Sequence, residues 1–181
     1  MSSTVTPQDI VTFWRNAGYE RWYAKDDAFD QELRDRFMGT WEAARDGKLS
    51  NWQESDEGVL ALLIVLDQFP RNMFRGDVRA FSTDPLARTV ASRAITEGRD
   101  QHIEQGMRSF MYLPFEHSED MADQERSIAL FGSLSADSLK WAVLHADIIR
   151  KFGRFPHRNA VLGRATTPEE SVFLSDGGFA G

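Results

Sequence analysis

The side chains best suited to chemistry are concentrated in two similar segments of this sequence. The first is Leu66-Asp67-Gln68-Phe69-Pro70-Arg71-Asn72, and the second is Phe152-Gly153-Arg154-Phe155-Pro156-His157-Arg158-Asn159. Each ends a stretch typical of a helix, continues through Phe-Pro, and then presents an arginine and an asparagine. The guanidinium group of arginine forms bidentate hydrogen bonds with carboxylates and phosphates. If the two segments meet in the fold, they predict a pocket for a small anionic ligand.

The similarity of the two segments also has a simpler interpretation, because Phe-Pro is a common way to end a helix. The arginines around both segments can equally pair with some of the 28 acidic residues. They can also stabilise helix C-termini, where the helix dipole favours cations. The sequence alone leaves this structural alternative open.

Asp67 stands directly after Val59–Leu66, an unbroken run of eight apolar residues. A helix that is apolar on every side must be surrounded by protein, so we expect Asp67 to be buried. A buried carboxylate is costly unless it is paired and hydrogen-bonded. We therefore expect an arginine partner for Asp67, supplied by the second segment. The pair is then either a structural strut or part of a binding site.

Histidines supply the candidate acids and bases, because an unperturbed imidazole titrates near neutral pH. His145 lies on the predicted core face of its helix, and His157 follows the second Phe-Pro pair. His117 and Glu119 lie at a predicted helix N-terminus, a place where anions bind, whereas we expect His102 to be solvated. A metal site built from His117, Glu119, His145 and His157 is an alternative, but the spacing matches no standard zinc motif. We therefore assign no metal, and the sequence identifies no cofactor.

The binding-site hypothesis gathers these side chains into one pocket. The catalytic candidates are His145, His157 and Asp67, and the ligand-binding candidates are Gln68, Arg71, Asn72, His117, Glu119, Arg154, Arg158 and Asn159. A dyad of Ser118 with a histidine is less well supported, because no G-x-S-x-G elbow surrounds the serine. The alternatives are a helical scaffold that binds a peptide or protein, and a buried polar network that only fixes helix packing. The sequence does not decide whether the protein is an enzyme.

Helix signals dominate the chain and must position these residues. Caps, glycine stops and apolar spacing predict helices over about 7–17, 28–46, 55–68, 84–97, 103–112, 118–134, 135–151 and 167–176. Asp27, Ser55 and Thr83 are among the expected N-caps, and an aromatic linker follows Gly18. The third helix should end near Gln68 and the fifth before Pro114, because proline disfavours helical geometry in the preceding residue. The pattern predicts an all-α fold without significant sheet, either an antiparallel helical bundle or a tetratricopeptide-like array of about seven or eight helices.

The composition excludes several classes of protein. The chain has 181 residues, so we expect a single all-α domain over residues 1–181. A net charge of −7 and a pI near 5.1 argue against a nucleic-acid or anionic-membrane partner. The absence of cysteine excludes disulfides and thiolate metal sites, and no signal peptide or apolar run of ~18 residues is present. We expect a soluble, cytoplasmic protein whose partner is a small anionic ligand or a peptide, of unpredicted oligomeric state.

The two Phe-Pro segments and the stretches around them also resemble a known family. The further segments are Leu113-Pro114-Phe115-Glu116-His117-Ser118-Glu119, Leu162-Gly163-Arg164 and Thr166-Thr167-Pro168-Glu169-Glu170. Together they resemble the signature segments of DUF924, a largely bacterial family of unknown function that is grouped with tetratricopeptide-like helical folds. The resemblance extends from Phe13 to Leu174. It implies an all-α fold but no established activity, so no catalytic residue is carried over from it.

Overall fold

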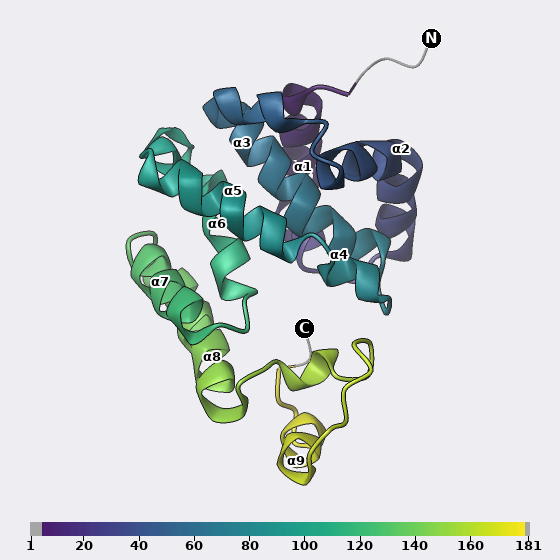
Figure 1. The fold of residues 1–181 in the computed structure, drawn as a ribbon, viewed down its shortest axis with the longest axis vertical. Coiled ribbons are helices and arrows are strands. Elements are labelled where there is room, and N and C mark those ends of the chain that lie inside the picture. The colour runs from purple at the N-terminus through teal and green to yellow at the C-terminus, as the bar shows by residue number, and fades with distance from the viewer. Residues whose placement is uncertain (1–4, 180–181) are drawn as a thin grey trace. The chain divides into compact units, whose positions relative to one another are not determined.

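The computed structural model describes residues 5–179, and this range is α-helical with no β-strand (Figure 1). A π-helical turn, Ile64–Gln68, joins α3 to α4, and we call the continuous helix the α3–α4 rod. Counting the rod once gives eight helices in the described range, which confirms the prediction. None of them is long and apolar enough to cross a membrane. The α-helices are α1 (Pro7–Trp22), α2 (Asp27–Arg45), α3 (Asp56–Leu63), α4 (Phe69–Met73), α5 (Asp84–Thr96), α6 (Gln105–Glu116), α7 (Met121–Gly132), α8 (Ala136–Phe152) and α9 (Pro168–Ser175).

The backbone divides into two compact units. The N-terminal unit comprises the chain up to Arg75 together with Arg79–Pro114, and the C-terminal unit comprises Gly76–Val78 together with the chain from Phe115 onward. Short 3-10 helices occur at Ser50–Glu54, Val78–Phe81, Arg99–His102 and Pro156–Arg158. The single domain over residues 1–181 remains a prediction.

The first helix begins as predicted but ends later. Thr6 and Asp9 form a capping box, in which each side chain accepts a hydrogen bond from the other residue's backbone N–H. Gly18 interrupts the helix with φ 76°, a conformation open to glycine. The chain is helical again up to Trp22, so the expected aromatic linker is wrong. The Trp22 indole N–H donates to the carbonyl oxygen of Trp14 at 2.7 Å, which ties the two parts of α1 together.

The second helix starts one residue earlier than the sequence indicated. Asp26, rather than Asp27, is its N-cap, and the Asp26 carboxylate accepts hydrogen bonds from the N–H groups of Ala28 and Phe29. Asp27 instead lies in the first helical turn, where the helix dipole favours an acidic side chain.

The α3–α4 rod forms the centre of the N-terminal unit. Ser55 caps its start, as predicted, and every residue from Val59 to Phe69 is buried. Three aromatic rings, those of Phe13, Trp14 and Phe37, lie within 6.4 Å of the Phe69 ring, centroid to centroid. The prediction that protein surrounds this helix on every side is confirmed.

The rod does not end near Gln68, so the predicted Phe-Pro break is wrong. Phe69 keeps helical dihedral angles (φ −56°, ψ −43°), and the helix continues to Met73. Proline inside an α-helix clashes with the carbonyl four residues earlier. Here the turn before Pro70 is a π-helix, in which the N–H of Phe69 donates to Ile64, five residues back. This wider turn accommodates the ring.

Proline also lacks the N–H that would serve the carbonyl of Leu66. The hydroxyl group of Thr83 donates to that carbonyl instead, at 2.5 Å and in a buried position. Thr83 is the N-cap residue of α5, as predicted, but its side chain makes no capping hydrogen bond to that helix. The prediction that the fifth helix ends before Pro114 is also wrong, because α6 runs through Pro114 to Glu116.

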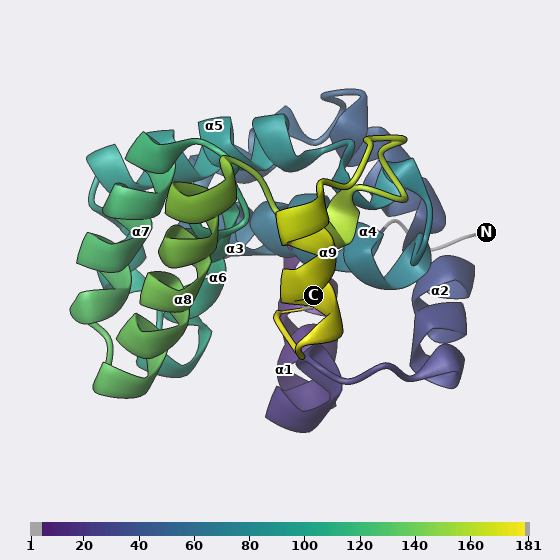
Figure 2. The same cartoon turned by 90° about the horizontal axis from the view of Figure 1, so that it is seen from below.

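In the C-terminal unit, α7 and α8 lie side by side and are joined by a short loop (Figure 2). Asp120 caps α7, Ser135 caps α8, and Gly153 ends α8 in the left-handed conformation with φ 70°. Thr167 and Glu170 form the predicted capping box of α9. A small apolar core contains Ile148, Ile149 and Phe155, with Met121, Phe152, Phe173 and Phe179 packed against it.

Candidate functional site

In the N-terminal unit, Arg71 lies between two buried carboxylates. Its guanidinium donates to both carboxylate oxygens of Asp84 at 3.0 Å and lies 3.2 Å from Oδ1 of Asp67. Gln68 also donates to the Asp67 carboxylate, whose side chain is only 1% exposed. Burial alone would lower the pKa of Arg71, but the charges of these two carboxylates raise it. The structure thus pairs Asp67 with an arginine of its own segment, and a partner from the second segment remains a prediction.

Asn72 serves a different carboxylate in the same unit. Its side-chain amide donates to Oδ1 of Asp30 at 2.8 Å, and the Arg75 guanidinium donates to both oxygens at 2.6 and 3.2 Å. Asp30 is buried in the first turn of α2. The end of the rod is therefore fixed to α2 by one shared carboxylate.

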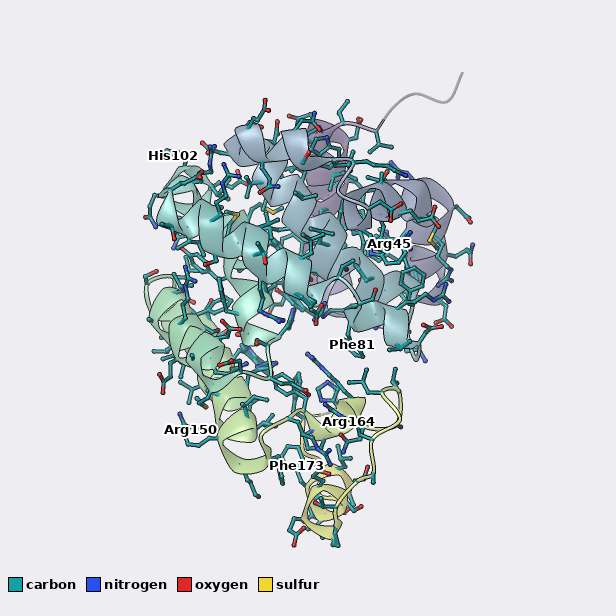
Figure 3. The ribbon with its side chains drawn as sticks, viewed as in Figure 1. Arg45, Phe81, His102, Arg150, Arg164 and Phe173 are labelled. Atoms are coloured by element: carbon teal, nitrogen blue, oxygen red, sulfur yellow. The ribbon has the colours of Figure 1, made fainter. Side chains whose placement is uncertain are left out.

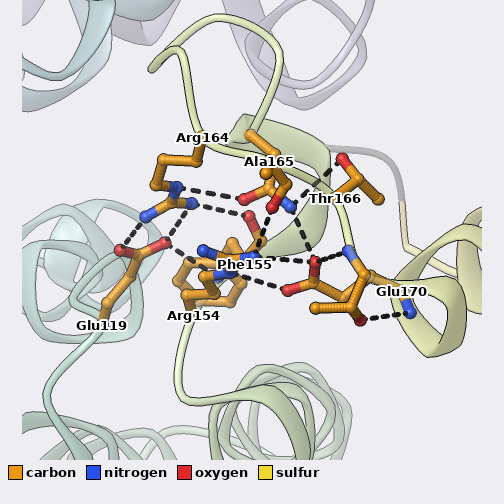
Figure 4. Close-up of polar contacts among 9 residues, drawn as sticks. Glu119, Arg154, Phe155, Arg164, Ala165, Thr166 and Glu170 are labelled. Carbon is orange, nitrogen blue, oxygen red and sulfur yellow. Dashed lines mark hydrogen bonds and ion pairs between the residues drawn. The ribbon is translucent and has the colours of Figure 1, made fainter.

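The C-terminal unit contains a matching arrangement around Glu170 (Figure 4). Arg154 donates to both oxygens of this carboxylate at 2.7 and 2.9 Å, and the amide of Asn159 donates to Oε2 at 3.0 Å. The N–H of Thr167 donates to Oε2 as well, which closes the capping box of α9. The Arg154 guanidinium is the main cause that lowers the pKa of Glu170 from 4.5 to about 2.

Glu119 is the second carboxylate of this network. Arg164 donates to both of its oxygens at 2.7 and 3.0 Å, and the backbone N–H of Phe155 donates to Oε1 at 2.8 Å. Burial alone would raise the pKa of Glu119, but Arg164 and this backbone N–H lower it. Arg164 also donates to the side chain of Asn159, so the two carboxylates are linked through one asparagine.

The two similar sequence segments thus share a local role. Asn72 and Asn159 each donate to a buried carboxylate that an arginine also holds bidentately. The backbone differs, because Pro70 lies within a helix whereas Pro156 begins a 3-10 turn after extended Phe155. What repeats is the side-chain chemistry and not the predicted helix stop.

A group of histidines and aromatic rings lies beside this network, and we call it the histidine cluster: His145, His157, Arg158, Phe155 and Phe179. Both imidazoles contact both phenyl rings, with centroid distances from 4.6 to 5.7 Å. The guanidinium carbon of Arg158 lies over the Phe155 ring at 4.5 Å. His145 is 6% exposed and Arg158 is 7% exposed. The cluster therefore combines three nitrogen-bearing side chains in an apolar surround.

The hydrogen bond of His145 determines its neutral tautomer. Its Nδ1 lies 2.9 Å from the carbonyl oxygen of Trp141, and a carbonyl oxygen only accepts, so Nδ1 carries the proton. The lone pair of the neutral ring is then on Nε2. Glu116 Oε1 lies 3.6 Å from the same Nδ1. Nδ1 of His157 is buried and has no hydrogen-bond partner within residues 5–179.

Both imidazoles are uncharged at neutral pH. Burial, and then the positive charge of neighbouring groups, lowers the pKa of His145 and of His157 from 6.5 to about 4. Arg158 and His117 are among those neighbours for both rings, while Glu119 partly opposes the effect at His157. Neither histidine therefore titrates near neutral pH. Titration in that range was the expectation from the sequence, which offered both residues as an acid or base.

The structure also bears on the metal site and on the Ser118–histidine dyad, the two alternative sites considered from the sequence. Within residues 5–179, no three histidine or acidic side chains are placed to hold a metal ion. The hydroxyl of Ser118 donates to Asp123 Oδ2 at 2.6 Å and accepts from the N–H of Asp120 at 3.2 Å. Ser118 thus stabilises the start of α7, which is a role expected near a helix N-terminus.

The predicted site residues fall into both units. Asp67, Gln68, Arg71 and Asn72 belong to the N-terminal unit, and His117, Glu119, His145, Arg154, His157, Arg158 and Asn159 belong to the C-terminal unit. One pocket shared by both sets, and the catalytic roles of His145, His157 and Asp67, remain predictions. Within the units, the structure brings Asp67, Gln68 and Arg71 together, joins Arg154 to Asn159 through Glu170, and gathers His145, His157 and Arg158 around Phe155.

Three carboxylates of these networks were not among the predicted site residues. Asp30, Asp84 and Glu170 each lie in the first turn of a helix, where the helix dipole alone explains an acid. The only signal in the sequence was the group of arginines around the two Phe-Pro segments, because such arginines can require acidic partners elsewhere in the chain.

Comparison with known proteins gives one solved structure of the same fold. It is titled "Structure of Protein of Unknown Function ATU0120 from Agrobacterium tumefaciens", with a TM-score of 0.92 and 48% sequence identity over 94% of this chain and 97% of that chain. No curated protein matches the sequence. Residues 10–178 match the family described as "Bacterial protein of unknown function (DUF924)". This chain therefore belongs to the DUF924 family.

Proposed function

We propose that this protein binds a small anionic ligand at the histidine cluster of its C-terminal unit. The observation that carries the proposal is the convergence of His145, His157 and the Arg158 guanidinium on one phenyl ring, that of Phe155. An anion in a site of low dielectric is stabilised by guanidinium and imidazole donors. The ligand class is a carboxylate or phosphate of metabolite size.

The electrostatics of the cluster support an anion in particular. The pKa values of His145 and His157 are low partly because positive groups surround them, Arg158 among them. A negative ligand reverses this effect, so it favours the imidazolium form and its additional hydrogen bonds. Nδ1 of His157, buried and without a partner in the described range, is one atom that such a ligand would satisfy. Binding should therefore take up protons.

Three other arginines are bound by carboxylates of the protein. Arg71, Arg154 and Arg164 each form bidentate pairs with carboxylates of the protein. A ligand would have to compete with those carboxylates for the same donors. We therefore assign these three residues, with Asn72 and Asn159, to the networks that hold the fold around the cluster.

Isothermal titration calorimetry with inorganic phosphate and with citrate tests the proposal. We expect binding that is about tenfold or more tighter near pH 5 than near pH 7.5, because the imidazolium forms are then accessible. His157→Gln and His145→Gln should weaken it. His102→Gln is the matched control, since His102 is an exposed histidine of the N-terminal unit (Figure 3). Equal affinity in all three variants, or no binding of either anion, would overturn the proposal.

A peptide-binding scaffold is the second candidate, and one observation favours it. Helix α8 exposes Trp141, Val143 and Leu144, with Trp141 47% exposed. Exposed apolar side chains on one helix are a common feature of protein–protein contacts. An apolar peptide at this helix would shift the fluorescence of Trp141 to shorter wavelength, and Trp141→Phe would abolish the shift. Phosphate would leave it unchanged, so the two functions are distinguishable.

A further inference from the structure

Helix α8 carries a concentrated group of exposed apolar side chains. Trp141, Val143 and Leu144 are 47%, 38% and 39% exposed, and they lie within about one turn of the helix. They are three of the seven large apolar side chains that are exposed among residues 5–179. The packed side of the same helix carries the buried residues Ala142 and Ala146. Scattered exposed apolar residues need no explanation, but a group of them on one helix marks an interaction surface.

Charged side chains extend this surface along the helix in both directions. Lys140 lies four residues before Leu144 and Asp147 lies three residues after it, and Asp137 and Lys151 lie seven residues away on either side. All four charged residues are exposed. Residues with this spacing of three and four share one face of an α-helix, as along the seam of paired helices. We call this set the α8 face: Asp137, Lys140, Trp141, Leu144, Asp147 and Lys151.

The central charges of the α8 face are available to a partner. Within residues 5–179, neither Asp137 nor Lys140 forms an ion pair. Asp147 pairs with Arg150 one turn away on the same helix, and these side chains are 60% and 56% exposed. Such an exposed pair contributes little to stability and leaves the carboxylate able to accept a second cation.

The order of these charges is self-complementary in an antiparallel pair of α8 helices. A two-fold axis beside Leu144 places Lys140 of each copy opposite Asp147 of the other, and Asp137 opposite Lys151. The helix dipole alone explains Asp137 and Lys151, which lie in the first and last turns. It does not explain Lys140 and Asp147, which lie further inside the helix. Pairing across a two-fold axis accounts for all four charges.

We propose that the α8 face binds a second copy of this chain as a symmetric, antiparallel helix pair. In this register Trp141 of each copy packs against Leu144 of the other, between the two Lys140–Asp147 ion pairs. A contact made by one helix from each copy is small, so the dimer is weak and depends on concentration. It occupies the face considered above for an apolar peptide, and it is independent of anion binding at the histidine cluster.

Sedimentation velocity of the full chain from about 10 μM to about 1 mM tests the occupant of the face. We expect the sedimentation coefficient to rise with concentration from that of a monomer towards that of a dimer. Leu144→Glu should abolish the rise. Val172→Glu should retain it and is the matched control, because Val172 is 57% exposed on α9, outside the α8 face.

Two results of this experiment would overturn the proposal. One is a wild-type chain that remains monomeric at about 1 mM, which leaves the peptide as the occupant of the face. The other is a dimer that Leu144→Glu and Val172→Glu weaken equally, which places the contact elsewhere. Both substitutions introduce a charge at an exposed position, so the unfolding midpoints of the two variants should match that of the wild type.

Charge reversal tests the antiparallel register. Lys140→Glu or Asp147→Lys alone places like charges opposite each other twice in the dimer, and each should weaken dimerisation at least about tenfold. An equimolar mixture of the two variants should dimerise about as strongly as the wild type. In the mixed dimer, the introduced glutamate of one chain faces the introduced lysine of the other, and the unchanged Asp147 and Lys140 still form a pair. Single variants that dimerise like the wild type, or a mixture no stronger than either variant alone, would overturn the proposal.

Discussion

The guanidinium of Arg154 holds the carboxylate of Glu170 through two parallel hydrogen bonds, at 2.7 and 2.9 Å. Because Glu170 also completes the capping box of α9 and accepts from Asn159, this pair joins the end of α8 to the start of the last helix. Such closure is the property of a structural network, in which the loss of one member leaves the others unsatisfied.

Arg154→Ala should therefore lower the midpoint of urea unfolding clearly, since Glu170 is left without its main partner. Arg150→Ala is the control, because Arg150 is exposed and pairs with the exposed Asp147 on α8 (Figure 3). A midpoint of Arg154→Ala that equals that of the control would show that the arginine is held for a ligand and not for the fold.

Arg71→Ala should destabilise the N-terminal unit by about 3 kcal/mol, because it removes a guanidinium that pairs with two buried carboxylates. Asp67 and Asp84 are the carboxylates concerned. Arg93→Ala removes an exposed partner of Glu97 on α5 and should change little. Chemical denaturation of the two variants measures the difference, and equal stability would contradict the burial argument.

Thr83→Val should cost about 1–3 kcal/mol, the cost of leaving a buried carbonyl unsatisfied. The carbonyl is that of Leu66, which Pro70 cannot serve. Thr89→Val offers a matched control, because the Thr89 hydroxyl donates to Pro85 on an exposed part of α5. If the two valine variants unfold at the same urea concentration, the proposed compensation for Pro70 is wrong.

Acid should destabilise the protein in two stages. The pKa values of His145 and His157 lie near 4 in the folded chain and near 6.5 when unfolded, so the unfolded state binds more protons between these values. The free energy of unfolding therefore decreases as the pH falls from 6.5 to 4. Its slope against pH corresponds to up to about two protons, one for each histidine. The Glu170 contribution, present above pH 4.5, is lost as the pH falls towards 2. Replacing both histidines by glutamine should flatten the first stage, as measured by unfolding at several pH values.

The sequence predicts local features of the fold well. The capping residues Thr6, Ser55 and Thr167 and the burial of Val59–Leu66 depend on neighbouring residues, so their patterns are visible in the chain. The need of Asp67 for an arginine follows from the same burial.

The features that the sequence misses depend on residues brought together by tertiary packing. Helix continuation through Pro70 requires the hydroxyl of Thr83, and the role of Asn72 requires Asp30 on α2. Neither partner is marked by a local motif. The low pKa of the two cluster histidines likewise arises from burial and from Arg158, which no spacing rule reports.

The most direct test of the central claim is an NMR titration of the imidazole carbon-bound protons of His145 and His157, with and without saturating phosphate. Without phosphate, both should titrate near pH 4. With phosphate, the account predicts that at least one pKa rises by about two units or more, equivalent to about hundredfold tighter binding to the protonated form. Titration curves that do not change on adding phosphate would contradict an anion site at the histidine cluster.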